Sequence, residues 1–137
     1  MNDLLNKVYE VSPEDFAKLK LEFIDNQEIF LVELSGSEIQ SWDDYVTMMQ
    51  TNFRFPTTCN DSVDRYLDWM RDLSWIEKEK FILVIHQFDR FLQNMPELKS
   101  EIISDFIDII LPFWQEEVSQ VIVGGRAKNF LVYLVKE

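Results

Sequence analysis

The sequence is poor in cysteine, histidine, glycine and proline, and each shortage narrows what the protein can be. One cysteine, Cys59, allows no internal disulfide, so a hydrophobic core must hold the fold. One histidine and one cysteine are also too few for a closed zinc site, which takes four such ligands. Three glycines and four prolines leave few chain breaks, and no repeat or flexible linker is visible. We therefore predict a single domain over residues 1–137.

Positive charge is also scarce. Lys and Arg number 13 against 25 Asp and Glu, so the formal net charge is 13 − 25 = −12. Binding to nucleic-acid phosphates requires clustered Lys and Arg, so direct nucleic-acid binding is excluded as a function. The acidity does not indicate disorder, because 47% hydrophobic and 14% aromatic residues can bury a large core. The composition predicts a folded acidic domain.

Long hydrophobic runs are absent. The longest apolar stretch, residues 106–114, contains Asp108 and Pro112 and is far shorter than the roughly 20 residues that a bilayer span needs. Residues 1–7 show neither the basic start nor the apolar stretch of a secretory signal. These features predict a protein without membrane attachment that stays in the cytoplasm.

Apolar periodicity and turn signals predict alternating strands and helices. Ser12-Pro13 predicts a helix running to Phe23, within an N-terminal extension of residues 1–26. The expected elements that follow are strand 29–34, helix 41–52, helix 60–74, strand 81–85, helix 96–117 broken at Pro112, strand 121–123, and a hairpin strand 130–135 after Gly124-Gly125. Strands separated by helices predict a small α/β fold with a parallel sheet.

The helix expected over residues 60–74 carries a row of acids. At 100° per residue, its four aspartates fall within about 80° of one another, opposite an apolar face; they are Asp61, Asp64, Asp68 and Asp72. Like charges four residues apart cost helix stability, which Arg65 and Arg71 partly offset. One interpretation is a solvated face with internal pairing. The other is a recognition surface for a cationic partner, because a fixed row of carboxylates accelerates encounter and selects opposite charge.

Other chemistries fit less well. A nucleophilic Cys59 at a helix start would need His86, which lies at the far end of a strand, so we favour an inert thiol. Asp61, Asp64 and Asp68 could hold Mg²⁺ or Ca²⁺, but the spacing is not that of a calcium loop. Gly124-Gly125 fits a hairpin turn better than a phosphate loop. The tryptophans could anchor an interface or fill the core; they are Trp42, Trp69, Trp75 and Trp114. We expect no cofactor and no metal.

Several segments of the sequence resemble the barstar family, the intracellular inhibitors of barnase-type ribonucleases. Residues 34–45, Leu-Ser-Gly-Ser-Glu-Ile-Gln-Ser-Trp-Asp-Asp-Tyr, resemble the family's first strand, glycine turn and first helix. Residues 53–56, Phe-Arg-Phe-Pro, resemble the end of that helix. Residues 60–68, Asn-Asp-Ser-Val-Asp-Arg-Tyr-Leu-Asp, are similar to the family's Gly-x-Asn-Leu-Asp-Ala-Leu-Trp-Asp. The resemblance continues through residues 81–88 and to about residue 123.

The resemblance implies a fold and a function. The fold would be a three-stranded parallel sheet packed with helices over residues 27–123, with residues 124–137 as an added C-terminal strand. The function would be that of an inhibitor or immunity protein, which lays its acidic helix into the phosphate-binding active site of a basic ribonuclease. Asp64 and Asp68 would be the main contacts. The expected surrounding contacts are Asp61, Asp72, Asn60, Trp69 and Glu117, and Trp75 would flank the contact. The alternative is an acidic adaptor for a basic protein that is not a nuclease.

The chain departs from the family pattern at two places beside the acidic helix. The family has aromatic residues and a glycine before this helix, where this chain has Thr57, Thr58, Cys59 and Asn60. It has tryptophan before the second aspartate, where this chain has Leu67. The resemblance therefore implies the fold more firmly than it implies barnase itself as the cognate enzyme.

Overall fold

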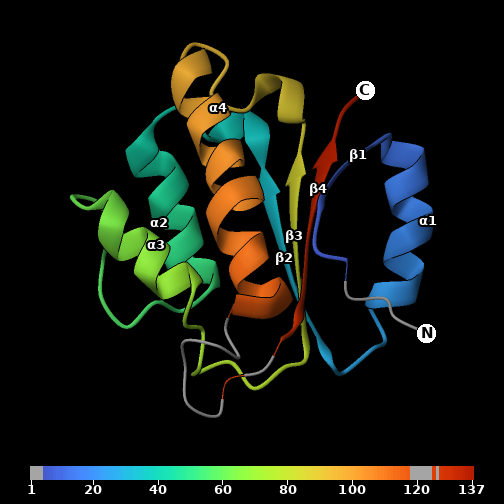
Figure 1. Ribbon diagram of the computed structural model, residues 1–137. Helices are drawn as coiled ribbons and strands as arrows, with labels where there is room; N and C mark the ends of the chain where they lie inside the picture. Colours follow the sequence, from blue (N-terminus) through green and yellow to red (C-terminus); the bar gives the residue numbers. More distant parts are fainter. Residues whose placement is uncertain (1–4, 118–124, 126) are drawn as a thin grey trace.

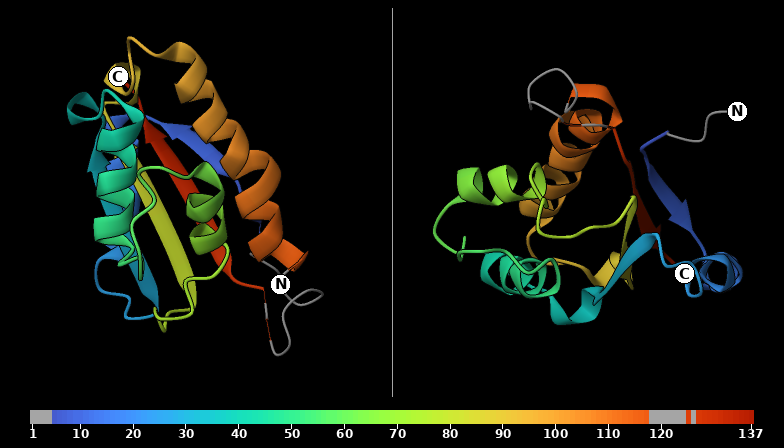
Figure 2. Two further views of the ribbon diagram at one scale, coloured as in Figure 1. Left: turned by 90° about the vertical axis from the view of Figure 1, so that its left-hand side faces the viewer. Right: turned by 90° about the horizontal axis from the view of Figure 1, so that it is seen from below.

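The computed structural model describes residues 5–117, 125 and 127–137, and its strands form one sheet with helices on both faces (Figures 1 and 2). The strands are β1 (Val8–Val11), β2 (Ile29–Ser35), β3 (Lys80–His86) and β4 (Asn129–Val135). The α-helices are α1 (Pro13–Phe23), α2 (Trp42–Asn52), α3 (Val63–Met70) and α4 (Pro96–Asp105). Short 3-10 helices η1 (Gly36–Glu38) and η2 (Phe88–Arg90) follow β2 and β3, and π-helical turns η3 (Phe106–Ile110) and η4 (Phe113–Glu117) follow α4.

The sheet has four parallel strands in the order β1-β4-β3-β2. The α/β class and the parallel sheet are confirmed, but the expected number of three strands is wrong by one. The additional strand is β1, which lies in the N-terminal extension and pairs with β4. The prediction that residues 130–135 form a hairpin strand is also wrong, because β4 lies parallel to β3 inside the sheet. The predicted strand 121–123 and the Gly124 turn fall outside the described residues.

The α1 and α2 helices begin where the sequence predicts. The Ser12 Oγ accepts a hydrogen bond from the Asp15 N–H at 3.1 Å, and the Ser41 Oγ accepts one from the Asp44 N–H at 3.0 Å. Such serine caps satisfy backbone donors that have no partner within the helix. The predicted helix spans 13–23 and 41–52 are confirmed.

The segment after α4 stays helical across Pro112, so the expected break there is wrong. The Leu111 N–H bonds to the Phe106 carbonyl five residues back, which is the wider spacing of a π turn. Proline lacks an N–H and normally leaves a carbonyl of the preceding turn without a donor. Widened turns on both sides of Pro112 let the segment continue instead of ending.

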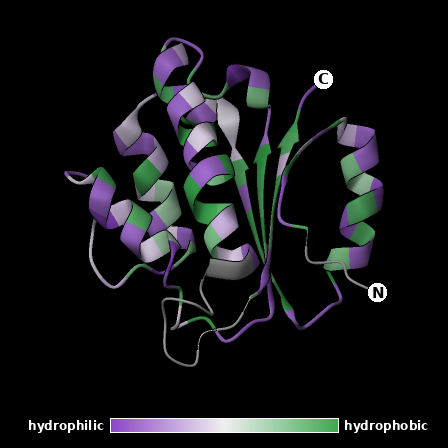
Figure 3. Cartoon of the chain, viewed as in Figure 1, coloured by the Kyte–Doolittle hydropathy of each residue, from purple (hydrophilic) through white to green (hydrophobic). Residues whose placement is uncertain are grey.

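The alternating side chains of the strands point into two separate apolar layers. Val32, Leu83 and Val132 belong to the larger layer under α2, α3 and α4, whereas Ile82, Val84 and Leu131 belong to the layer under α1. Figure 3 shows mostly apolar strands, whereas the helices combine polar and apolar residues. In the described part of the chain, no helix is long and apolar enough to cross a membrane. Because helices lie over both apolar layers, the sheet is covered on both faces, and α3 lies over the larger layer.

Candidate functional site

The acidic helix α3 is shorter than the sequence predicts. Ser62 caps it by accepting the Arg65 N–H at 3.0 Å, and the chain takes a left-handed conformation at Leu73 with φ of 53°. The helix therefore contains Asp64 and Asp68, while Asp61 precedes it and Asp72 follows it. The expected single helical row of four aspartates is confirmed only for the two inner members.

The inner face of α3 is anchored in the core. Tyr66 and Met70 are fully buried. The Tyr66 hydroxyl lies 2.6 Å from the Tyr45 hydroxyl of α2, and the Trp114 indole donates to the Met70 carbonyl at 2.9 Å. Burial raises the pKa of both tyrosines, so this pair is neutral over the physiological range. These contacts hold the helix in one position, with its acidic side outward.

The outward aspartates differ in what they bind. Arg65 Nη1 lies 3.0 Å from Asp61 Oδ1, and Arg71 Nη2 lies 3.1 Å from Asp68 Oδ1. The side chains of Asp61 and Asp68 remain 84% and 73% exposed, so both carboxylates are accessible to a partner. Asp72 Oδ1 accepts the backbone N–H of Ser74 at 3.1 Å. Asp64 is exposed, and no described side chain or backbone group forms a hydrogen bond or ion pair with its carboxylate.

The connection between α2 and α3 is held by tryptophan and arginine side chains. The Trp69 indole donates to Thr57 Oγ1 at 3.1 Å, and Trp69 also packs edge-on against Trp75, with ring centroids 5.5 Å apart. Arg65 Nη1 donates to the Thr58 carbonyl at 3.1 Å. Trp69 is half-buried, so the structure gives it a role in fixing this loop and leaves part of it beside the acidic face.

Asn60 links the start of the acidic region to α2. Its side-chain amide donates to Asp43 and to Thr47 Oγ1, and its carbonyl oxygen accepts from Gln50 Nε2 at 2.9 Å. The Trp42 indole donates to the Asn60 backbone carbonyl at 2.9 Å. The side-chain groups of Asn60 bond within the chain, and its role as a contact for a partner stays a prediction. Sequence reasoning missed this link because its partners lie 10 to 18 residues away.

Glu117, the other expected contact, is the last residue of η4, and its side chain lies outside the described part of the structure. The position of that carboxylate relative to α3 therefore stays a prediction.

Cys59 and His86 lie in different layers. Cys59 is buried in the larger layer, and burial raises the pKa of its thiol. The His86 ring packs edge-on against Phe16 in the layer under α1, and its Nε2 lies 2.8 Å from Glu33 Oε1. The sheet separates the two side chains, so they form no catalytic pair.

The described residues contain no group of three His, Cys, Asp or Glu side chains that could hold a metal ion. Asp61, Asp64 and Asp68 thus do not converge on one point. Asp61 and Asp68 are each paired with an arginine instead, and Asp64 has no described partner.

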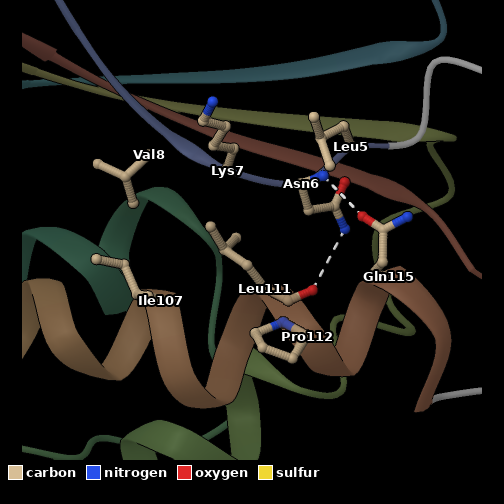
Figure 4. Close-up of a pocket in the computed structure, with 8 residues that line it drawn as sticks. All are labelled: Leu5, Asn6, Lys7, Val8, Ile107, Leu111, Pro112 and Gln115. Atoms are coloured by element: carbon tan, nitrogen blue, oxygen red, sulfur yellow. Dashed lines mark hydrogen bonds between the residues drawn. The ribbon is translucent and has the colours of Figure 1, made fainter.

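A separate cavity of about 470 Å³ lies between the N-terminal segment and the end of the α4 region (Figure 4). Its walls are mostly apolar, with Leu5, Val8 and Leu111 among them, and the Asn6 N–H donates to Gln115 Oε1 at 2.7 Å across it. Lys7 is its one ionisable lining residue in the described part of the chain. This cavity is distinct from the acidic face of α3.

The sequence profile of the family described as barstar (barnase inhibitor) matches residues 29–129. The chain belongs to the barstar family. Neither a curated protein nor a solved structure was found with significant similarity. The matched region begins at β2, so β1 and α1 are additions to the part that defines the family. The barstar match contains α3 with Asp64 and Asp68, and the family is described by inhibition of a ribonuclease.

Proposed function

We propose that this barstar-family protein is a non-enzymatic inhibitor of a ribonuclease, which it blocks by placing α3 in the enzyme's phosphate-binding site. Asp64 and Asp68 would be the principal contacts, with Asp61 and Asp72 at the edge. The observation that carries the proposal is the orientation of α3, which buries Tyr66 and Met70 and exposes both aspartates. Membership of the barstar family supports the class of target.

In the proposed complex, carboxylates of this protein occupy the places where the RNA phosphates would bind. A ribonuclease binds RNA phosphates with Arg and Lys, and these side chains form strong charge-assisted hydrogen bonds with carboxylates. Asp64 suits this role because its carboxylate needs no intramolecular bond to be broken before it binds. The buried anchors of α3 and the tied α2–α3 loop reduce the ordering cost of binding.

The net charge of −12 supports the same class of partner. A strongly acidic protein attracts a basic one over several ångströms and raises their association rate at low salt. We therefore expect the target to be a basic ribonuclease from the same cytoplasm, against which this protein acts as an immunity factor.

Affinity capture tests the proposal. The immobilised full-length protein is mixed with a lysate of the organism that carries the gene, and the eluted fraction is assayed for RNA cleavage. The matched control is Glu97→Ala/Glu101→Ala. It removes from α4 two exposed acids that are four residues apart in the sequence.

We expect wild type and this control to retain a ribonuclease, and Asp64→Ala/Asp68→Ala to lose it. Equal retention by all three proteins would contradict the proposed site. Retention of only a basic protein without nuclease activity would contradict the proposed target and favour an adaptor.

A further inference from the structure

The acidic face of α3 is flanked by two cations. Arg65 follows Asp64 within α3, and Arg71 is the residue directly after the end of α3, three residues after Asp68. The side chain of Arg65 is 44% exposed and that of Arg71 is 37% exposed. A partner that reaches Asp64 therefore also meets these guanidinium groups.

Both arginines are held in place by backbone oxygens as well as by carboxylates. Arg65 Nη1 bonds to the Thr58 carbonyl at 3.1 Å, and Arg71 Nε bonds to the Leu67 carbonyl at 3.1 Å. A guanidinium has five N–H donors, so these contacts leave donors for a further acceptor. These contacts place both guanidinium groups beside the acidic face, where an approaching cation meets their positive charge.

This arrangement favours one charge pattern in a partner over another. A dense cluster of Lys and Arg would be attracted by Asp64 but repelled by the two positive charges beside it. A surface that carries a cation next to a carboxylate would complement Asp64 and a guanidinium together. A ribonuclease active site that uses Asp or Glu as its general acid or base has this mixed pattern, because that carboxylate lies beside the cations that bind the phosphate.

We propose that Arg65 and Arg71 are specificity-determining residues that select a ribonuclease site in which a carboxylate adjoins the phosphate-binding cation and reject uniformly cationic sites. This inference rests on the proposed function and adds a requirement about the charge pattern of the target. It assigns to the two arginines a direct contact with the target in addition to their pairing with Asp61 and Asp68.

The test compares two binding partners, octa-arginine peptide and the ribonuclease recovered by affinity capture. The variant is Arg65→Gln/Arg71→Gln, because glutamine keeps hydrogen-bonding capacity and removes the charge. The control is Lys18→Gln/Arg90→Gln, which removes two exposed positive charges elsewhere and gives the same net charge. Dissociation constants are measured by titration calorimetry at low salt.

We expect the arginine variant to bind octa-arginine at least fivefold more tightly than the control does, and the ribonuclease at least tenfold more weakly. A general charge effect would strengthen both interactions, and a loss of structure would weaken both. Changes of the same sign for the two partners, or no difference from the control, would overturn the inference. If the proposed function itself is wrong, the affinity capture gives a different result, because retention of the ribonuclease then does not depend on Asp64 and Asp68.

Discussion

At the scale of single residues, the four aspartates of the predicted row have different roles in the structure. Asp72 bonds to its own turn, Asp61 and Asp68 are paired with arginines, and Asp64 alone among them has no described partner. Exposed ion pairs of this kind typically contribute less than about 1 kcal/mol to folding, so they can be exchanged for contacts with a partner at small cost. Residue type and spacing predicted the acidic row. They did not predict the different bonding partners of its aspartates, which depend on where α3 ends.

Glu33 supplies a pH-dependent contribution to stability on the opposite face of the sheet. Its two carboxylate oxygens each lie 2.8 Å from a nitrogen, one of Lys20 and one of His86. Burial acts to raise the pKa of Glu33, but the hydrogen bonds and charges of these two partners outweigh burial and hold the pKa below its usual value. The carboxylate is therefore more acidic in the folded protein than in the unfolded chain.

A group with a lowered folded pKa stabilises the protein above its unfolded pKa, about 4.3 for Glu, and loses that contribution as the pH falls through the folded value. We predict that Glu33→Gln unfolds at lower urea concentration than wild type at pH 6, and that the difference shrinks between about pH 5 and pH 3. Urea unfolding of both proteins at several pH values measures the difference between their midpoints. A difference that stays constant over this range would contradict the prediction.

At the scale of elements, α1 acts as the cover of the second face of the sheet. Phe16 and Phe23 are buried against β3 and β4, and the Phe16 and Tyr133 rings lie 5.9 Å apart. This cover lies before the residues that match the family.

We predict that Phe16→Ala lowers the free energy of unfolding by about 3–5 kcal/mol, because it leaves a cavity under α1. Leu21 lies on the same helix but is 71% exposed, and Leu21→Ala should change stability by less than about 0.5 kcal/mol. Chemical denaturation of both variants measures the contrast. Similar losses for the two variants would show that α1 does not bury its Phe16 face in solution.

The elements also show how far local sequence patterns predict this fold. Strands 29–34 and 81–85 and the helices at 13–23 and 41–52 were predictable, because continuous apolar runs and serine caps are local signals. The short strand β1 was missed because four residues, Val8–Val11, form too short a pattern. The pairing of β4 was wrong because the register between β4 and β3 joins residues about 50 apart, which no local pattern encodes.

The sequence predicted the charge of the acidic site better than the contacts that hold the site in place. The aspartate spacing indicated an acidic helix, and the apolar positions opposite it indicated which face is buried. The bonds of Asn60 and Trp69 within the chain were not predictable, because they depend on how the α2–α3 loop folds back on α2. The left-handed turn at Leu73, which ends the helix early, also has no signal in residue type.

At the scale of the whole molecule, the sheet and its two helical layers present α3 on one side as a firmly anchored acidic element. The net charge of −12 first excluded nucleic acid as a ligand. Together with the family and the exposed aspartates, the same charge supports a partner that itself binds nucleic acid. In the proposed function, Asp64 and Asp68 block the active site of a ribonuclease.

The most direct test is an inhibition titration of the captured ribonuclease, with RNA cleavage measured as inhibitor is added. We predict that wild type abolishes cleavage at one inhibitor per enzyme, and that the inhibition constant of Asp64→Ala/Asp68→Ala is about 100-fold higher, since loss of paired charges in an interface costs about 3 kcal/mol. Glu97→Ala/Glu101→Ala should inhibit as wild type does. Equal inhibition by the Asp64→Ala/Asp68→Ala variant and wild type, or binding without loss of cleavage, would contradict the proposed function.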